Sequence, residues 1–105
     1  MKIHHLALAQ AWAEAQETGT YTMSTLGLEL DDVGFIHCSR PEQVAGVHQR
    51  FYGEVTDQVL LLTIDTDLLT SPWQLDKVQG SDKTFPHVYG PLNISAVLSV
   101  EPYVP

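Results

Sequence analysis

The spacing of apolar residues predicts a strand followed by a helix at the start of the chain and a central strand in its middle. KIHHLAL at residues 2–8 predicts a strand, and AQAWAEAQETG after it predicts a helix that ends at Gly19, with Trp12 and Ala15 at helical spacing. DQVLLLTID at residues 57–65 is a continuous apolar run, which predicts a strand buried on both faces. We expect this strand to lie in the centre of a sheet.

A second strand and helix are predicted around residues 34–53. GFIHC at residues 34–38 predicts a short buried strand. Ser39 and Glu42 then fit the S-x-x-E capping box, and Pro41 falls in the first turn of the helix that this box predicts. Gly53 closes that helix, and its apolar positions at helical spacing are Val44, Val47 and Phe51.

The remaining segments predict shorter elements. Residues 21–32 indicate a loop with a short strand or a helical turn, 66–72 a turn with helical character, 73–78 a strand and 79–83 a loop. A last strand is marked by Ile94, Val97 and Val100 and ends at Pro102. The chain of 105 residues is therefore predicted to form one α+β domain, residues 1–105, with a mixed or antiparallel sheet and two main helices.

Composition and charge narrow the possible partners. Hydrophobic residues make up 44% of the chain and charged residues 17%, as in ordered globular proteins. The formal net charge of −8 comes from 13 acidic and 5 basic side chains, and such a surface repels a phosphate backbone. Nucleic-acid binding is therefore not expected, whereas a small anionic ligand remains compatible with the few basic residues.

The start of the chain and its single cysteine predict a cytoplasmic protein. Cys38 has no partner for an intrachain disulfide, and MKIHHLALAQAWAEAQ has no apolar stretch of signal-peptide character. No run approaches the roughly 18 apolar residues that span a bilayer. We expect no membrane association from this pattern.

Histidines are the residues that most clearly carry candidate chemistry. His4 and His5 are neighbours on a strand and must point to opposite faces, whereas His37 and Ser39 share a face and Cys38 points away from it. A His-x-Ser pair in a cleft is one interpretation. The other is that His37 forms hydrogen bonds in the core and Ser39 only caps the helix. Arg40 beside the helix start adds the option of holding a phosphate.

His87 lies in FPHVYGPL, whose two prolines predict a stiff, shaped loop rather than a regular element. That loop either positions a ligand or only pins a turn. A thiol nucleophile is disfavoured because His37 and Cys38 face opposite sides, and a buried free thiol is the better interpretation of Cys38. Zinc is not predicted, although His5, His37 and His87 are the residues that could converge on it, because no ligand-spacing motif is present.

Several motifs together identify a family resemblance. IHHLA, GFIHCS, Gln43, RFYG and FPHVYGPL resemble the bacterial family called domain of unknown function 952, from about Ile3 to Val100. Trp12, Gly19 and Tyr21 also fall where the pattern of that family places them. This family is distantly similar to the ADP-ribosyltransferases, including the RNA 2'-phosphotransferases that use NAD.

The resemblance implies an ADP-ribosyltransferase-like fold and a cleft for a nucleotide-type ligand such as NAD. It implies that His5 and Ser39 hold ribose hydroxyls, that Tyr21 or Tyr89 stacks on a ring, that Arg40 meets a phosphate, and that His37 or His87 transfers protons. Leu6 and Ala7 stand where those transferases have glycine and threonine, and no glutamate stands at the third position. The alternative is therefore a binding module that kept the fold without the chemistry.

Overall fold

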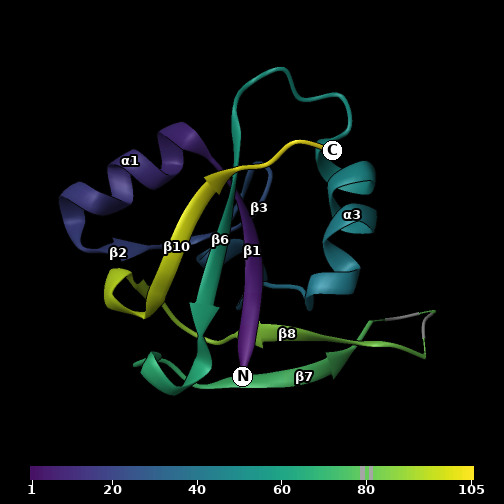
Figure 1. The fold of residues 1–105 in the computed structure, drawn as a ribbon. Coiled ribbons are helices and arrows are strands. Elements are labelled where there is room, and N and C mark those ends of the chain that lie inside the picture. The colour runs from purple at the N-terminus through teal and green to yellow at the C-terminus, as the bar shows by residue number, and fades with distance from the viewer. Residues whose placement is uncertain (79, 81) are drawn as a thin grey trace.

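Strand β6 (Val59–Asp65) lies in the middle of the larger sheet in the computed structural model, which describes residues 1–78, 80 and 82–105 (Figure 1). It pairs antiparallel with β1 (Lys2–Leu8) on one side and with β10 (Val97–Pro102) on the other. Leu62 of β6 packs in the larger apolar cluster and Val59 in the smaller one. The predicted central position is confirmed. The strand makes apolar contacts on both faces, but the predicted burial is incomplete, because only Val59, Leu62 and Ile64 are buried and the other residues are half-buried.

A second sheet has the order β5-β8-β7 and is also antiparallel. It consists of β5 (Ile36–His37), β7 (Trp73–Lys77) and β8 (Thr84–Val88). An isolated bridge between His4 and Ser39 connects β1 to the residues that follow β5. The register places His37 opposite His87, so the two histidine motifs of the sequence meet here.

His87 lies in strand β8, so the prediction of a stiff irregular loop for FPHVYGPL is wrong at its first residues. Proline restricts φ to a value that extended backbone also adopts. The Pro86 carbonyl accepts a hydrogen bond from the Cys38 amide at 2.9 Å, which ties this part of β8 to the chain after β5. Composition alone did not show that Pro86 has a strand neighbour.

Short elements complete the chain, and every strand pair in the described residues is antiparallel. Residues 21–32, predicted as a loop with short elements, contain strands and one helical turn. The loop predicted at 79–83 includes Gln79 and Ser81, which lie outside the described residues. These short elements are β2 (Thr20–Tyr21), β3 (Met23–Thr25), β4 (Leu28–Glu29), α2 (Leu30–Val33), η3 (Thr66–Leu68), β9 (Leu92–Asn93) and η4 (Ile94–Ala96).

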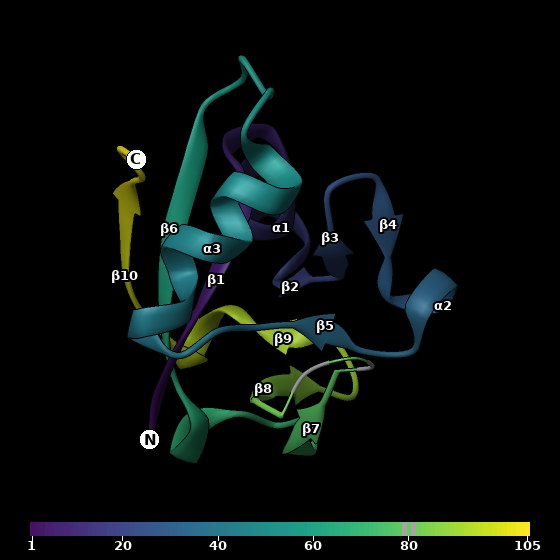
Figure 2. The same ribbon diagram turned by 90° about the vertical axis from the view of Figure 1, so that its right-hand side faces the viewer.

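Helix α1 (Ala9–Thr18) follows β1 as predicted and buries Trp12 and Ala15. Gly19 ends it with a φ of 89°, a left-handed conformation that glycine adopts without steric cost. Figures 1 and 2 show that α1 and α3 (Val44–Val47) lie on different sides of the β1-β6-β10 sheet. The fold is therefore the expected single α+β domain.

The second helical segment has three parts and begins later than predicted. A 3-10 turn, η1 (Pro41–Gln43), leads into α3 and then into a π-helical turn, η2 (His48–Tyr52). The amide of Arg40 donates to Oε1 of Gln43 at 2.9 Å, so these residues replace the predicted Ser39 and Glu42 capping pair. Ser39 does not cap because its backbone forms the bridge with His4.

The π-helical turn changes which side chains the second helical segment buries. Val44 packs in the smaller apolar cluster and Val47 against it, as their helical spacing predicted. Phe51 is 38% exposed, and the adjacent Tyr52 is buried instead. A π turn adds a residue to the helical repeat, so a pattern based on α-helical spacing points to the wrong residue there. No helix in the described residues is long and apolar enough to cross a membrane.

Candidate functional site

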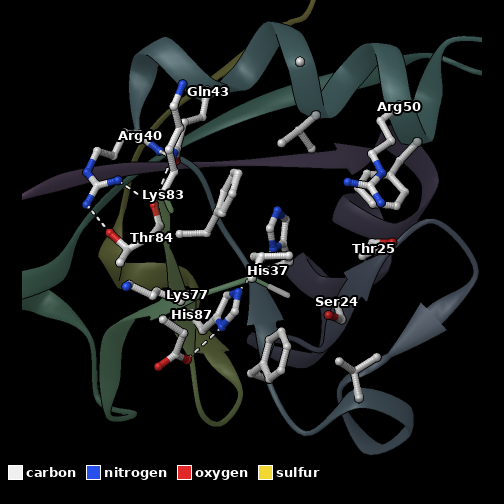
Figure 3. Close-up of a pocket in the computed structure, with 18 of the residues that line it drawn as sticks. Ser24, Thr25, His37, Arg40, Gln43, Arg50, Lys77, Lys83, Thr84 and His87 are labelled. Atoms are coloured by element: carbon white, nitrogen blue, oxygen red, sulfur yellow. Dashed lines mark hydrogen bonds and ion pairs between the residues drawn. The ribbon is translucent and has the colours of Figure 1, made fainter. Parts of the chain in front are cut away.

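A cleft of about 1240 Å³ lies between the β5-β8-β7 sheet and the second helical segment, with β3 at one end (Figure 3). Cavities of several hundred Å³ or more accommodate small molecules and cofactors. Figure 3 shows His37 and His87 in the middle of the labelled side chains, with Arg40 and Arg50 at separate ends. Residues from both histidine motifs therefore line one cleft.

Four side chains in the cleft form a network of hydrogen bonds. Nδ1 of His37 lies 3.3 Å from Nε2 of His87, and Nδ1 of His87 donates to Oδ2 of Asp76 at 2.8 Å. The hydroxyl of Tyr89 also donates to Oδ2 of Asp76. These hydrogen bonds lower the pKa of Asp76, with the Tyr89 bond as the largest cause. Asp76 is thus a carboxylate at neutral pH and accepts from both partners.

His37 is neutral at physiological pH because burial and nearby charge oppose its protonation. Burial is the main cause that lowers its pKa to about 4, followed by the charges of His87, His5 and Arg50. Its ring packs against Phe85, with ring centroids 5.2 Å apart. Atom Nε2 of His37 is buried and has no hydrogen-bond partner within the described residues. A neutral imidazole can take up a proton or donate one to a ligand.

Phe35 holds the His87 ring from the side. The two rings stack with centroids 3.9 Å apart and an angle of 13° between their planes. Together with the hydrogen bond to Asp76, this contact fixes both the position and the rotation of the ring. His87 is only 5% exposed, so it is a buried member of the site.

His5 and Tyr21, predicted to contact ribose or to stack on a ring, lie behind the cleft. Nδ1 of His5 donates to the carbonyl of His37 at 2.6 Å, and Nε2 of His5 accepts from the Tyr21 hydroxyl at 2.9 Å. Both residues are buried, at 3% and 2% exposure, and neither lines the cleft. Their positions support the backbone of β5, where His37 lies.

Of the other residues predicted to contact a ligand, Arg40 and Tyr89 line the cleft and Ser39 does not. Ser39 is 4% exposed and borders a small cavity of about 10 Å³ behind the cleft. Arg40 lines the cleft, but its guanidinium donates to the carbonyl of Thr84 at 2.6 Å and to its hydroxyl at 2.7 Å. Tyr89 also lines the cleft and is 37% exposed. Cys38 is fully buried, which raises the pKa of its thiol to about 12 and confirms the buried free thiol that was predicted.

Basic and aromatic side chains are concentrated at the cleft. Four of the five basic residues and all three phenylalanines of the chain line it, whereas only three of the 13 acidic residues do. Arg50 is exposed, and its Cζ lies 5.3 Å from the centroid of the Phe51 ring. The basic residues at the cleft are Arg40, Arg50, Lys77 and Lys83, and the phenylalanines are Phe35, Phe51 and Phe85.

Sequence reasoning missed Asp76, Arg50 and the phenylalanines as members of the site. Asp76 lies on an exposed strand, and its contact with His87 depends on the pairing of β7 with β8. The alternating pattern of WQLDKV at residues 73–78 predicted a strand, but it did not indicate which strand pairs with it. The described residues contain no group of three or more histidine, cysteine, aspartate or glutamate side chains arranged to hold a metal ion.

Comparison with known proteins places the chain in a family. The family described as protein of unknown function (DUF952) matches residues 6–100. Protein CC0527 from Caulobacter crescentus has a crystal structure that is similar to this chain, with 25% sequence identity and a TM-score of 0.80, over 97% of this chain and 85% of that chain. A double mutant of CC0527 gives 24% identity with the same TM-score and coverage. No curated protein matches the chain. The match over residues 6–100 shows that this chain belongs to the DUF952 family of proteins of unknown function.

Proposed function

We propose that the cleft binds a nucleotide-type ligand, with NAD as the first candidate, and that the protein transfers the ADP-ribosyl group of NAD to an acceptor. The observation that carries this proposal is the concentration of basic side chains, aromatic rings and two histidines in one cleft of an otherwise acidic protein. Cationic side chains form strong hydrogen bonds with phosphates, and aromatic rings stack on nucleobases. The resemblance to ADP-ribosyltransferases selects NAD among the nucleotides.

The exposed side chains of the cleft suit the phosphates and the base of such a ligand. Arg50 and Lys77 are exposed, and neither side chain forms a hydrogen bond or an ion pair within the described residues. Their cationic groups are therefore available to phosphate oxygens. The rings of Phe51 and Tyr89, at 38% and 37% exposure, are accessible for stacking by a base. Arg40 contributes positive charge while it remains bonded to Thr84.

The proposed reaction exchanges one bond at the ribose for another. The bond between the nicotinamide nitrogen and the ribose carbon breaks, and its electron pair stays with the nitrogen, so that nicotinamide leaves as a neutral molecule. The nucleophilic atom of the acceptor forms the new bond to that carbon. The proton of the acceptor passes to a histidine of the cleft, His37 or His87, and then to solvent.

An NMR titration of ¹⁵N-labelled protein with NAD tests both parts of the proposal. We expect amide shifts confined to residues 34–40 and 82–90 and to the η2 turn, followed by nicotinamide release over hours. His37→Gln is expected to abolish release. His48→Gln is the matched control, because His48 contacts Tyr103 and does not line the cleft.

Each outcome has a distinct meaning. Shifts without release, in the presence and absence of candidate acceptors, would contradict the transfer reaction and support the alternative of a binding module. No shifts at millimolar NAD would contradict NAD as the ligand. Equal loss of release in the His37→Gln and His48→Gln variants would show that the effect is not specific to the cleft.

A further inference from the structure

Two buried polar atoms of residues that line the cleft have no hydrogen-bond partner within the described residues. They are Nε2 of His37 and Oγ of Ser24, and Ser24 on β3 is only 1% exposed. Both residues line the cleft and also the small cavity behind it, which has about the volume of one water molecule. Buried polar atoms are nearly always paired in native proteins. This pair therefore indicates a place for a polar group that comes from outside the chain.

The carboxylate of Asp76 fixes the direction of the hydrogen bonds that lead to this place. A carboxylate only accepts, so His87 carries its proton on Nδ1, the atom 2.8 Å from Asp76. In a neutral ring, Nε2 of His87 is then an acceptor. Nδ1 of His37, 3.3 Å away, must be the donor of that hydrogen bond. Nε2 of His37 is consequently left without a proton and can only accept.

An acceptor nitrogen beside a serine hydroxyl fits a ligand group that carries a proton to donate. A phosphate dianion or a carboxylate has no such proton and is repelled by the lone pair of Nε2. A hydroxyl group can donate to Nε2 and accept from the hydroxyl of Ser24 at the same time. The place beside Ser24 and His37 thus suits a hydroxyl group, whereas the basic side chains of the cleft suit phosphate.

We propose that Asp76, acting through His87, keeps the proton of His37 on Nδ1, so that Nε2 of His37 is the general base for a hydroxyl group of water or an alcohol bound beside Ser24. This inference rests on the proposed transferase function and names its acceptor class. His37 is the catalytic residue, and Asp76 and His87 are positioning residues.

The proton balance follows from this arrangement. As the acceptor oxygen bonds to the ribose carbon, its proton moves to Nε2 of His37. The proton on Nδ1 of His37 can then move to Nε2 of His87, and the resulting imidazolium lies against the carboxylate of Asp76. Positive charge thereby develops next to a negative group rather than beside Arg50. The proton returns to solvent after the product leaves.

The arrangement of protons can be tested without any ligand. Long-range ¹H–¹⁵N spectra of histidine rings distinguish a proton on Nδ1 from one on Nε2, and we expect Nδ1 protonation at both His37 and His87 at pH 7 to 8. Asp76→Ala is expected to shift both rings toward Nε2 protonation. Gln74→Ala removes the donor to the other oxygen of that carboxylate and is expected to leave both rings unchanged, since Gln74 does not line the cleft. Nε2 protonation of His37 in the wild-type protein would overturn the proposal.

The acceptor class is tested by product analysis. With NAD and increasing methanol, we expect mass spectrometry to detect methyl ADP-ribose in place of free ADP-ribose, whereas methylamine should give no adduct. Nicotinamide release should fall about tenfold or more in Asp76→Ala and in Ser24→Ala, and less than threefold in Gln74→Ala. An amine adduct would overturn the acceptor assignment. No release at all would contradict the proposed function and the acceptor class with it, while the ring spectra would still decide the role of Asp76.

Discussion

The hydroxyl of Tyr21 is a structural group, because it satisfies a histidine that has no access to water. Nε2 of His5 accepts from it at 2.9 Å, and both residues are buried. Tyr21→Phe leaves that nitrogen unpaired in the core, so we expect the free energy of unfolding to fall by about 1–3 kcal/mol. Urea unfolding measures the change. Tyr103→Phe, a less buried tyrosine whose hydroxyl has no hydrogen bond in the described residues, should change stability by about 0.5 kcal/mol or less. Equal effects of the two variants would contradict the role given to Tyr21.

The same burial makes the stability of the protein depend on pH. Burial lowers the pKa of His5 from 6.5 to about 4, so between these values the unfolded chain binds a proton that the folded chain does not. The contribution of His5 is therefore fully present above about pH 6.5 and is lost as the pH falls toward 4. We expect the free energy of unfolding to decrease by on the order of 2–3 kcal/mol from this residue alone.

Histidine NMR separates this effect from the titration of carboxylates at the same pH. The ring protons of His5 and His37 should keep their neutral shifts down to about pH 5, since burial lowers both pKa values to about 4. Urea unfolding at several pH values then gives the matching loss of stability. A midpoint near 6.5 for His5 would show that burial does not hold it neutral.

At the level of single residues, face alternation on strands was the most useful signal in the sequence. It separated His4 from His5 and placed Cys38 away from His37, and the structure agrees in both cases, with His4 beside Thr63 and Cys38 in the core. Alternation within a strand carries no information about a neighbouring strand. Asp76 was missed for this reason, since its bond to His87 comes from the register between β7 and β8.

Among the elements, the π-helical turn η2 ends where a side chain would collide with the backbone. A Cβ built on Gly53 would lie 2.8 Å from the carbonyl oxygen of Gln49. We expect Gly53→Ala to lower the free energy of unfolding by about 1–3 kcal/mol, because that backbone oxygen cannot move without opening the turn. Thermal or urea unfolding measures the change.

Gly46 in α3 provides the matched control, since a Cβ there meets nothing within 4 Å and its φ is not positive. Gly46→Ala should stabilise the protein by about 0.5–1 kcal/mol through lower entropy of the unfolded chain. If both variants destabilise to the same extent, the contact with Gln49 is not what makes Gly53 necessary.

The elements show which sequence patterns were sufficient and which were not. The α1 helix was predictable because a periodic apolar pattern and a closing glycine agree, and the β6 strand was predictable from its continuous apolar run. Ser39 was predicted as the N-cap of the second helical segment, whereas the structure has Arg40 there. Serine is a favoured capping residue, so the local pattern pointed to Ser39. Its hydrogen bonds to His4 are contacts over 35 residues of sequence, which a local pattern cannot reveal.

On the scale of the whole molecule, net charge gave an incomplete description. The value of −8 predicted repulsion of polyanions over most of the surface, and the residues outside the cleft include ten acidic side chains against one basic side chain, Lys2. The cleft collects four basic residues from separate elements, and only the fold brings them together. A negative surface around a small basic cleft favours a small anion over a long one.

This distribution leads to a prediction about binding in which net charge is held constant. Arg50→Gln and Lys2→Gln change the charge of the protein equally, but Arg50 lines the cleft beside His37 and Lys2 lies on the exposed start of β1. We expect Arg50→Gln to weaken NAD binding about tenfold, the usual scale for loss of one charge-assisted contact to a phosphate, and Lys2→Gln to change it less than twofold.

Calorimetric or NMR titration at about 0.05 and 0.5 M salt should show weaker wild-type binding at high salt, because added ions screen exposed charges. The difference between the variants should shrink in parallel. If Lys2→Gln weakened binding as much as Arg50→Gln, long-range attraction to the whole protein, rather than a phosphate contact in the cleft, would account for the affinity.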